Sequence, residues 1–99
     1  MAAYVIAQIE VTDPEAFEAY RQQVPSVIEQ YGGEYVVRGG AMEVLEGDWP
    51  RPRVVVLKFP SMDQAKAWHA SAAYEGPKTL RQSASKGNMI VVEGIDADE

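Results

Sequence analysis

Residues 35–50, in the middle of the chain, read YVVRGGAMEVLEGDWP. Two short apolar runs flank a break at Gly39-Gly40, and an acidic turn that ends in Trp49-Pro50 closes the stretch. We expect residues 42–45 to form a short continuation or a partner of the strand before the break. Because a pattern of strand and helix lies on either side, we interpret this stretch as the joint between two similar halves of one fold.

The half before this joint has the pattern of strand, helix and strand. Residues 3–11 are rich in β-branched side chains, which predicts a strand. Asp13 and Pro14 form a helix start, because an N-cap oxygen is followed by a ring preset for the first turn. Apolar residues then recur at steps of three and four up to Tyr31, and residues 34–38 form the second strand.

The half after the joint repeats this order. Residues 53–59 are apolar on both faces for most of their length, which is typical of a strand that is buried on both sides. Ser61 opens a capping box for the second main helix. A short helix is expected from Gly76 to Arg81, capped by Gly87, and the last strand over residues 88–93.

The predicted order is strand, helix, strand, and then strand, helix, strand again. This is the split βαβ arrangement of ferredoxin-like domains. We therefore predict an α+β fold in which a four-stranded antiparallel sheet carries two main helices on one face. Residues 1–95 form the single domain, and the acidic residues 96–99 are expected to be a frayed tail.

The composition narrows the classes of function. The net charge of −6 argues against a nucleic-acid partner, because phosphate binding needs a basic patch. The chain has no cysteine and no residues with the spacing of a metal site, so neither a metal nor a cofactor is expected. No apolar run reaches the roughly 20 residues of a membrane helix, and no secretory signal is seen, so we expect a cytoplasmic protein without a membrane partner.

The predicted sheet has more apolar surface than two helices can cover. Residues 54–57 and 90–92 place apolar side chains on both faces of their strands. An open apolar face of this size exceeds what monomers usually expose. We therefore expect a homodimer through the open sheet face, with two-fold symmetry. The alternative is a monomer whose open face is screened by loops and the tail.

Several motifs are spread along the chain, namely YRQQVP at residues 20–25, YGGEYVVRGG at 31–40, VLEGDW at 44–49 and VLKFPSM at 56–62. Together they resemble the domain of unknown function 1330 family over nearly the whole chain. The resemblance implies a ferredoxin-like protomer and the sheet-to-sheet dimer of the dimeric α/β-barrel group. That group includes cofactor-free mono-oxygenases, isomerases of small lactones, haem enzymes and ligand-sensing domains, so the resemblance leaves the function open.

His69 is the only histidine, and its ordinary pKa of about 6.5 suits acid–base catalysis. It is a candidate catalytic residue, and the alternative is a histidine that packs or hydrogen-bonds locally at the edge of a helix. It also departs from the resembled family, in which an aromatic residue such as tyrosine is expected at this position.

Arg38 stands at the end of a strand, where its guanidinium is able to clamp a carboxylate. The alternative is an internal ion pair with one of the acidic residues of the following turn, Glu43, Glu46 or Asp48. Trp49 either covers a pocket or pins its loop to the core.

An aromatic set surrounds the helices, and a cleft lined by it would suit a flat organic ligand. We therefore predict a small dimeric domain that binds an apolar or aromatic acid between sheet and helices. Arg38 would meet the negative group, and Arg81 is a possible second cation, for which a solvated face is the alternative. The residues expected to line the cleft are Tyr20, Trp49, Trp68 and Tyr74.

Two alternatives stay open. One is a cofactor-independent enzyme of the mono-oxygenase or isomerase type, in which His69 or a tyrosine hydroxyl moves a proton and Arg38 stabilises an enolate-like anion. The other is a stress or scaffold protein without a pocket.

Overall fold

The structure is a computed structural model that describes residues 1–95; the expected tail at residues 96–99 lies outside the described residues. Its elements, in chain order, are β1 (Ala3–Val11), α1 (Pro14–Gln30), β2 (Glu34–Arg38), β3 (Arg53–Phe59), α2 (Met62–His69), α3 (Ala72–Ala84) and β4 (Ser85–Glu93).

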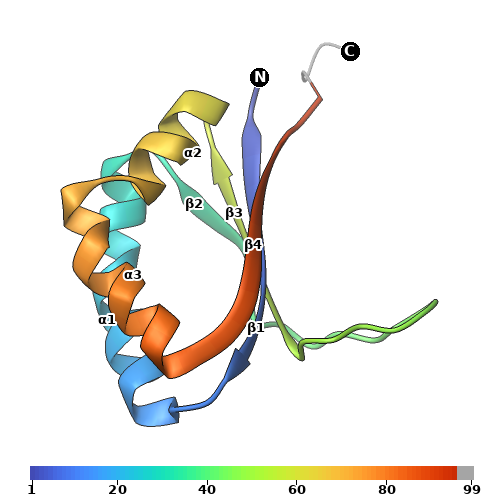
Figure 1. Cartoon of the computed structure of the whole chain (residues 1–99). Helices are drawn as coiled ribbons and strands as arrows, with labels where there is room; N and C mark the ends of the chain where they lie inside the picture. The colour runs from blue at the N-terminus through green and yellow to red at the C-terminus, as the bar shows by residue number, and fades with distance from the viewer. Residues whose placement is uncertain (96–99) are drawn as a thin grey trace.

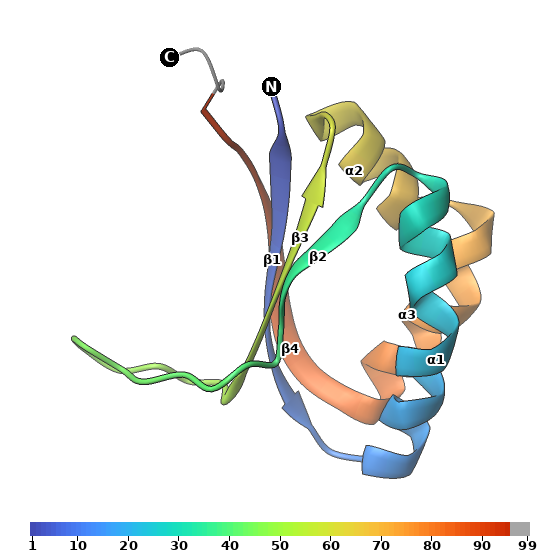
Figure 2. The same cartoon turned by 180° about the vertical axis from the view of Figure 1, so that it is seen from behind.

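One antiparallel sheet forms the centre of the molecule, with the strand order β2-β3-β1-β4. β1 lies in the middle of the sheet and pairs with β3 and β4 over most of its length. All three helices cover the same face, and the other face carries no helix (Figures 1 and 2). The predicted ferredoxin-like α+β fold is thereby confirmed.

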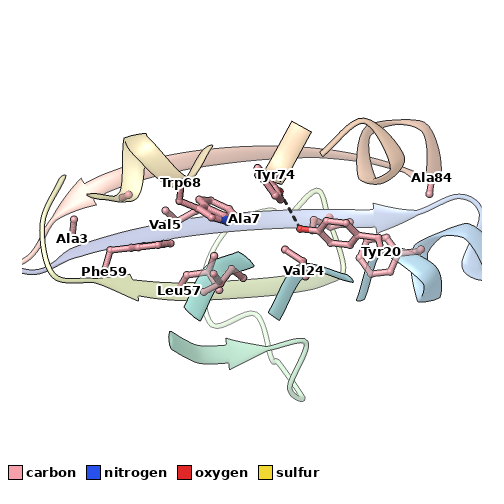
Figure 3. Close-up of a cluster of buried hydrophobic side chains, with 14 residues drawn as sticks. Ala3, Val5, Ala7, Tyr20, Val24, Leu57, Phe59, Trp68, Tyr74 and Ala84 are labelled. Carbon is pink, nitrogen blue, oxygen red and sulfur yellow. Dashed lines mark hydrogen bonds between the residues drawn. The ribbon is translucent and has the colours of Figure 1, made fainter. Parts of the chain in front are cut away.

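The core lies between the sheet and the helices (Figure 3). Alternate residues of β1 point toward the helices, because successive side chains of a strand face opposite sides of the sheet. The apolar stripe of α1 meets them at steps of three and four residues. The buried residues of these two elements are Ala3, Val5, Ala7, Ile9, Phe17, Tyr20, Val24 and Ile28.

Both predicted helix starts are present. The backbone N–H of Ala16 donates to Oδ1 of Asp13 at 3.2 Å, and that of Gln64 donates to Oγ of Ser61 at 3.2 Å. Each side-chain oxygen satisfies one of the four amide groups that a helix start leaves without a partner.

The third helix differs from the prediction. It runs over 13 residues from Ala72 to Ala84 rather than from Gly76 to Arg81, so the sheet carries three substantial helices. Ser71 caps it by accepting the Tyr74 N–H at 3.1 Å, and Pro77 is tolerated inside it. The predicted start at Gly76 was wrong because this cap and the burial of Tyr74, Arg81 and Ala84 outweigh the hydrogen bond that Pro77 removes.

Gly87 does not cap a helix, as was predicted, but lies inside β4. A β-carbon at this position would approach the carbonyl oxygen of Gln8 on β1 to 2.6 Å. The close approach of β1 and β4 therefore explains why a residue without a side chain occupies this position.

Residues 39–52 form a long loop, which we call the arm. Residues 42–45 do not continue or pair with β2, so that prediction was wrong. The chain leaves the sheet at Gly39, whose φ of 69° is the left-handed conformation that glycine adopts readily. The arm projects on the side of the sheet opposite the helices (Figures 1 and 2).

The open face of the sheet is apolar along β4. Ile90 and Val92 are 58% and 44% exposed on this face. Nearby, the Oε1 atom of Gln8 on β1 is buried without a hydrogen-bond donor among residues 1–95. The open face thus holds both exposed apolar groups and an unmatched polar atom.

Candidate functional cleft

A small cavity of about 30 Å³ lies between the sheet and the helices. All four strands and all three helices contribute to its wall, which is mostly apolar. A cavity of this size has room for one or two water molecules. Its polar lining groups come from three arginines at one end and from Tyr20, Trp68 and Arg81.

A β-bulge in β2 aims Arg38 at this cavity. Tyr35 pairs with Leu57 and Arg38 pairs with Val55, with the register shifting at Val36. Without the bulge, residues three apart in a strand would point to opposite faces. With it, Tyr35 and Arg38 share the helix-covered face, and Cζ of Arg38 lies 4.5 Å from the centre of the Tyr35 ring.

Arg21 and Arg53 join Arg38, and we call these three residues the arginine mouth. Arg53 comes from β3, and its Cζ lies 5.5 Å from the centre of the Phe17 ring. Arg21 comes from α1, and its backbone oxygen accepts a hydrogen bond from Nη2 of Arg38 at 3.1 Å. Burial, and then the charges of Arg21 and Arg38, lower the pKa of Arg53.

The arginine mouth has more positive than negative charge. Glu18 pairs with Arg21 at 3.0 Å, and the other ion pair within residues 1–95 joins Arg51 to Glu10 at 3.9 Å, outside the cavity. Arg38 makes none of the ion pairs with the acidic arm residues that the alternative prediction required. Three guanidinium groups therefore face one carboxylate.

Two donors of the mouth also have no acceptor. The Nε atoms of Arg21 and Arg53 are buried and have no hydrogen-bond partner among the described residues. The same is true of Nε of Arg51, which does not line the cavity. A buried donor without an acceptor costs about 1–3 kcal/mol.

A second polar group lies among the helices. The hydroxyl oxygens of Tyr20 and Tyr74 are 3.1 Å apart (Figure 3). Nε of Arg81 donates to the Tyr74 hydroxyl at 3.3 Å. Arg81 is only 7% exposed, so the solvated face considered for it was wrong. Burial, followed by the effect of Tyr74, raises the pKa of Tyr20 far above its ordinary value of 10, so this hydroxyl keeps its proton.

Trp68 is fully buried and forms one wall of the cavity. Its ring centre lies 4.2 Å from that of Tyr74 and 5.4 Å from that of Phe59. The Nε1–H of Trp68 has no acceptor within residues 1–95.

His69 and Trp49 do not share this cavity. His69 is exposed and lies along a groove of about 260 Å³ between α2 and β4. Partial burial, and then the charges of Lys78 and Arg81, lower its pKa. Trp49 is 48% exposed on the arm, along a groove of about 490 Å³ that arm residues form with Val37 and Val54.

The structure thus brings Arg38, Tyr20 and Trp68 to one cavity, with Tyr74 bonded to Tyr20 behind it. Sequence reasoning missed Arg21 and Arg53. Simple alternation places Arg53 on the same face as Leu57, and the helical step of four places Arg21 beside Phe17, so both arginines had a detectable signal. Tyr35 belongs to the aromatic set expected around the helices, but only the bulge shows that it shares a face with Arg38.

Neither a cluster of metal ligands nor a membrane-spanning helix is present among residues 1–95. No group of three or more histidine, cysteine or carboxylate side chains in that range has the arrangement of a metal site. No helix in the same range is both long and apolar enough to cross a membrane.

Solved structures with the same fold come from several bacteria. A protein of unknown function from Rhodopseudomonas palustris, RPA0582, is 19% identical, with a TM-score of 0.78 over 96% of this chain and 83% of that one. SnoaB from Streptomyces nogalater, a cofactor-independent oxygenase, is 12% identical, with a TM-score of 0.65 over 97% and 95%. A dimeric ferredoxin-like protein of unknown function from Jannaschia is 9% identical, with a TM-score of 0.65 over 95% and 100%.

These likenesses concern the fold alone, because the identities are low. A comparison with curated protein sequences finds no match. The family model described as Domain of unknown function (DUF1330) matches residues 2–95, which is nearly the whole of the described chain and includes every element of the cleft. The motifs resemble those of this family because the chain belongs to the DUF1330 family.

Proposed function

We propose that the protein binds a small apolar or aromatic acid between the sheet and the helices, with its carboxylate at the arginine mouth. The observation that carries this proposal is the set of three guanidinium groups that face one carboxylate. Like charges held together raise the free energy of the folded protein, and the lowered pKa of Arg53 reflects this repulsion together with burial. An anionic ligand would relieve it.

The chemistry of the mouth favours a carboxylate over a halide or another spherical anion. A guanidinium presents its N–H groups as a planar fork that matches the two oxygens of a carboxylate. The buried Nε–H groups of Arg21 and Arg53 would gain the acceptors that they lack. The aromatic rings of Phe17 and Tyr35 border the mouth, and the wall behind them is apolar, which suits the body of an organic acid.

Binding of such a molecule requires side chains to move, because about 30 Å³ holds only one or two waters. Arg38 and Arg53 are the first candidates, since they lie over the rings of Tyr35 and Phe17 on long flexible stems. Tyr20 and Trp68 would form the inner wall, with Tyr74 supporting them from behind. In this proposal Trp49 makes no contact with the ligand.

We also propose that the protein is a homodimer through the open sheet face. Ile90 and Val92 are exposed there, and burial of apolar area stabilises an interface by roughly 25 cal/mol per Å². A second copy would also be able to supply a donor for Oε1 of Gln8. The dimeric ferredoxin-like protein from Jannaschia has the same protomer fold.

Binding has more support than catalysis. The likeness to the oxygenase SnoaB is a likeness of fold, and the residues that line the cavity include no histidine and no carboxylate to accept a proton. The raised pKa makes Tyr20 a hydrogen-bond donor rather than a base.

Benzoate is a suitable probe, since it combines one carboxylate with an aromatic body. We expect it to raise the melting temperature of the protein, because a ligand of the native state stabilises it by RT ln(1 + [L]/Kd). Arg38→Gln should weaken benzoate binding at least about tenfold, the effect of a charged hydrogen bond of about 1.5–3 kcal/mol. Arg51→Gln, which removes a cation outside the cavity, is the matched control. The proposal would be contradicted if millimolar benzoate did not raise the melting temperature, or if Arg38→Gln and Arg51→Gln lost equal benzoate affinity.

A further inference from the structure

Several hydrogen-bond donors line the cavity in addition to the arginine mouth. They come from α1, α2 and α3, whereas two of the three mouth arginines come from β2 and β3. Trp68 contributes its indole N–H, Arg81 its guanidinium and Tyr20 its hydroxyl, and all three residues line the cavity. We call this group the inner donors.

The inner donors outnumber their acceptors. Nε–H of Arg81 uses the Tyr74 oxygen, and the two tyrosine hydroxyls share one hydrogen bond. If Tyr74 donates to Tyr20, the hydrogen of Tyr20 is left over; if Tyr20 donates to Tyr74, the hydrogen of Tyr74 is left over. Nε1–H of Trp68 has no acceptor in either case, within residues 1–95. At least two unmatched donors therefore remain, the indole N–H of Trp68 and one tyrosine hydroxyl.

The charge of Arg81 is also uncompensated. Its side chain is more than nine-tenths buried, and neither ion pair within the described residues involves it. Transfer of an unpaired charge into a protein interior costs several kcal/mol. Arrangements of buried donors without matching acceptors are the ones that bind a carbonyl or an oxyanion strongly.

From this geometry we infer that the inner donors bind an oxygen atom of the ligand, a carbonyl, a phenolate or a second carboxylate. This inference rests on the proposed function, because the carboxylate of the same ligand would lie at the arginine mouth. The ligand class is then an apolar or aromatic acid with a second oxygen acceptor besides its carboxylate. A purely hydrocarbon body would leave Trp68 and the tyrosine pair without acceptors.

Two probes of nearly equal shape test this inference. 4-Acetylbenzoate carries a carbonyl oxygen where 4-isopropylbenzoate carries a methyl group, and both keep the carboxylate for Arg38. We expect the wild-type protein to bind 4-acetylbenzoate about tenfold more tightly in a calorimetric titration, the effect of one or two hydrogen bonds. Hydrophobicity alone would favour the isopropyl compound.

Trp68→Phe keeps an aromatic ring and removes the indole N–H, so the tenfold preference should fall to less than about threefold while 4-isopropylbenzoate binds as before. Tyr20→Phe removes one hydroxyl and provides a second test if Trp68→Phe does not fold. Tyr31→Phe, outside the cavity, should keep the full preference.

The outcomes separate the two proposals. If 4-isopropylbenzoate binds in a manner that depends on Arg38 but 4-acetylbenzoate binds no more tightly, the inner donors do not bind the ligand and only this inference fails. If neither compound binds, the proposed function fails with it.

Discussion

Gly39 lies directly against the guanidinium of Arg53, so closely that a β-carbon at position 39 would overlap it. The same glycine has a φ of 69° and donates its backbone N–H to the Val54 oxygen at 2.9 Å. The point at which the arm leaves the sheet therefore also positions one cation of the arginine mouth.

Gly39→Ala should consequently affect both stability and ligand binding. Gly47 is its matched control, because it has a φ of 71° but open space around its Cα. Alanine in this conformation costs about 1–2 kcal/mol at either position, and at position 39 the end of the flexible Arg53 side chain must also move aside. Urea unfolding should therefore show similar losses of stability in the two variants, whereas benzoate affinity should fall in Gly39→Ala only. Equal affinities in the two variants would show that Gly39 does not position Arg53.

The ring of Tyr35 should orient the guanidinium of Arg38, which lies over it. Tyr35→Leu removes the ring beneath the guanidinium, whose attraction is worth about 0.5–1 kcal/mol at an exposed site. We expect benzoate affinity to fall a few-fold, because Arg38 is then less well oriented. Tyr35→Phe keeps the ring and should bind benzoate as the wild type does. If Tyr35→Phe loses as much benzoate affinity as Tyr35→Leu, the hydroxyl of Tyr35 orients Arg38 and its ring does not.

The fold could be predicted from sequence because its signals are local and consistent. β1 shows its period of two, α1 its stripe, and Asp13 and Ser61 cap helices as expected. The prediction failed where tertiary packing overrides a local rule. Gly76 and Pro77 predict the start of a short helix, although the Ser71 cap and the burial of Tyr74 let this helix begin at Ala72.

The candidate site was less predictable than the fold. Arg38 was selected for its residue type and its place at a strand end, but its direction depends on the bulge at Val36, which no alternation rule shows. Arg81 takes part in neither ion pair of the described residues, and only the folded structure shows which side chains surround it.

The open sheet face should be the dimer interface. Ile90→Asp places a charge among apolar side chains and should convert a dimer into a folded monomer, because Ile90 is already 58% exposed in the protomer. Gln82→Asp, on the exposed surface of α3, makes the same charge change outside the interface and should remain dimeric. Sedimentation equilibrium at low micromolar concentration measures both. A wild-type monomer, or a dimer that is unaffected by Ile90→Asp, would exclude this interface.

His69 should make the protein less stable at mildly acidic pH. Partial burial and the charges of Lys78 and Arg81 lower its folded-state pKa below 6.5. The unfolded chain then takes up the proton at a higher pH than the folded protein does, so stability falls as the pH falls below about 6.5, until the folded pKa is passed. His69→Gln should lose less stability than the wild type between pH 7.5 and 5.5 in urea unfolding. Equal losses would show that His69 is not the titrating group.

The central claim is that the arginine mouth binds the carboxylate of a small acid. The most direct measurement is the ¹H–¹⁵N NMR spectrum of the arginine Nε–H groups during a titration with benzoate. We predict that the signals of Arg21, Arg38 and Arg53 shift together with one dissociation constant, while that of Arg51 remains in place. Signals that stay unchanged at millimolar benzoate, or an equal shift of Arg51, would contradict the account.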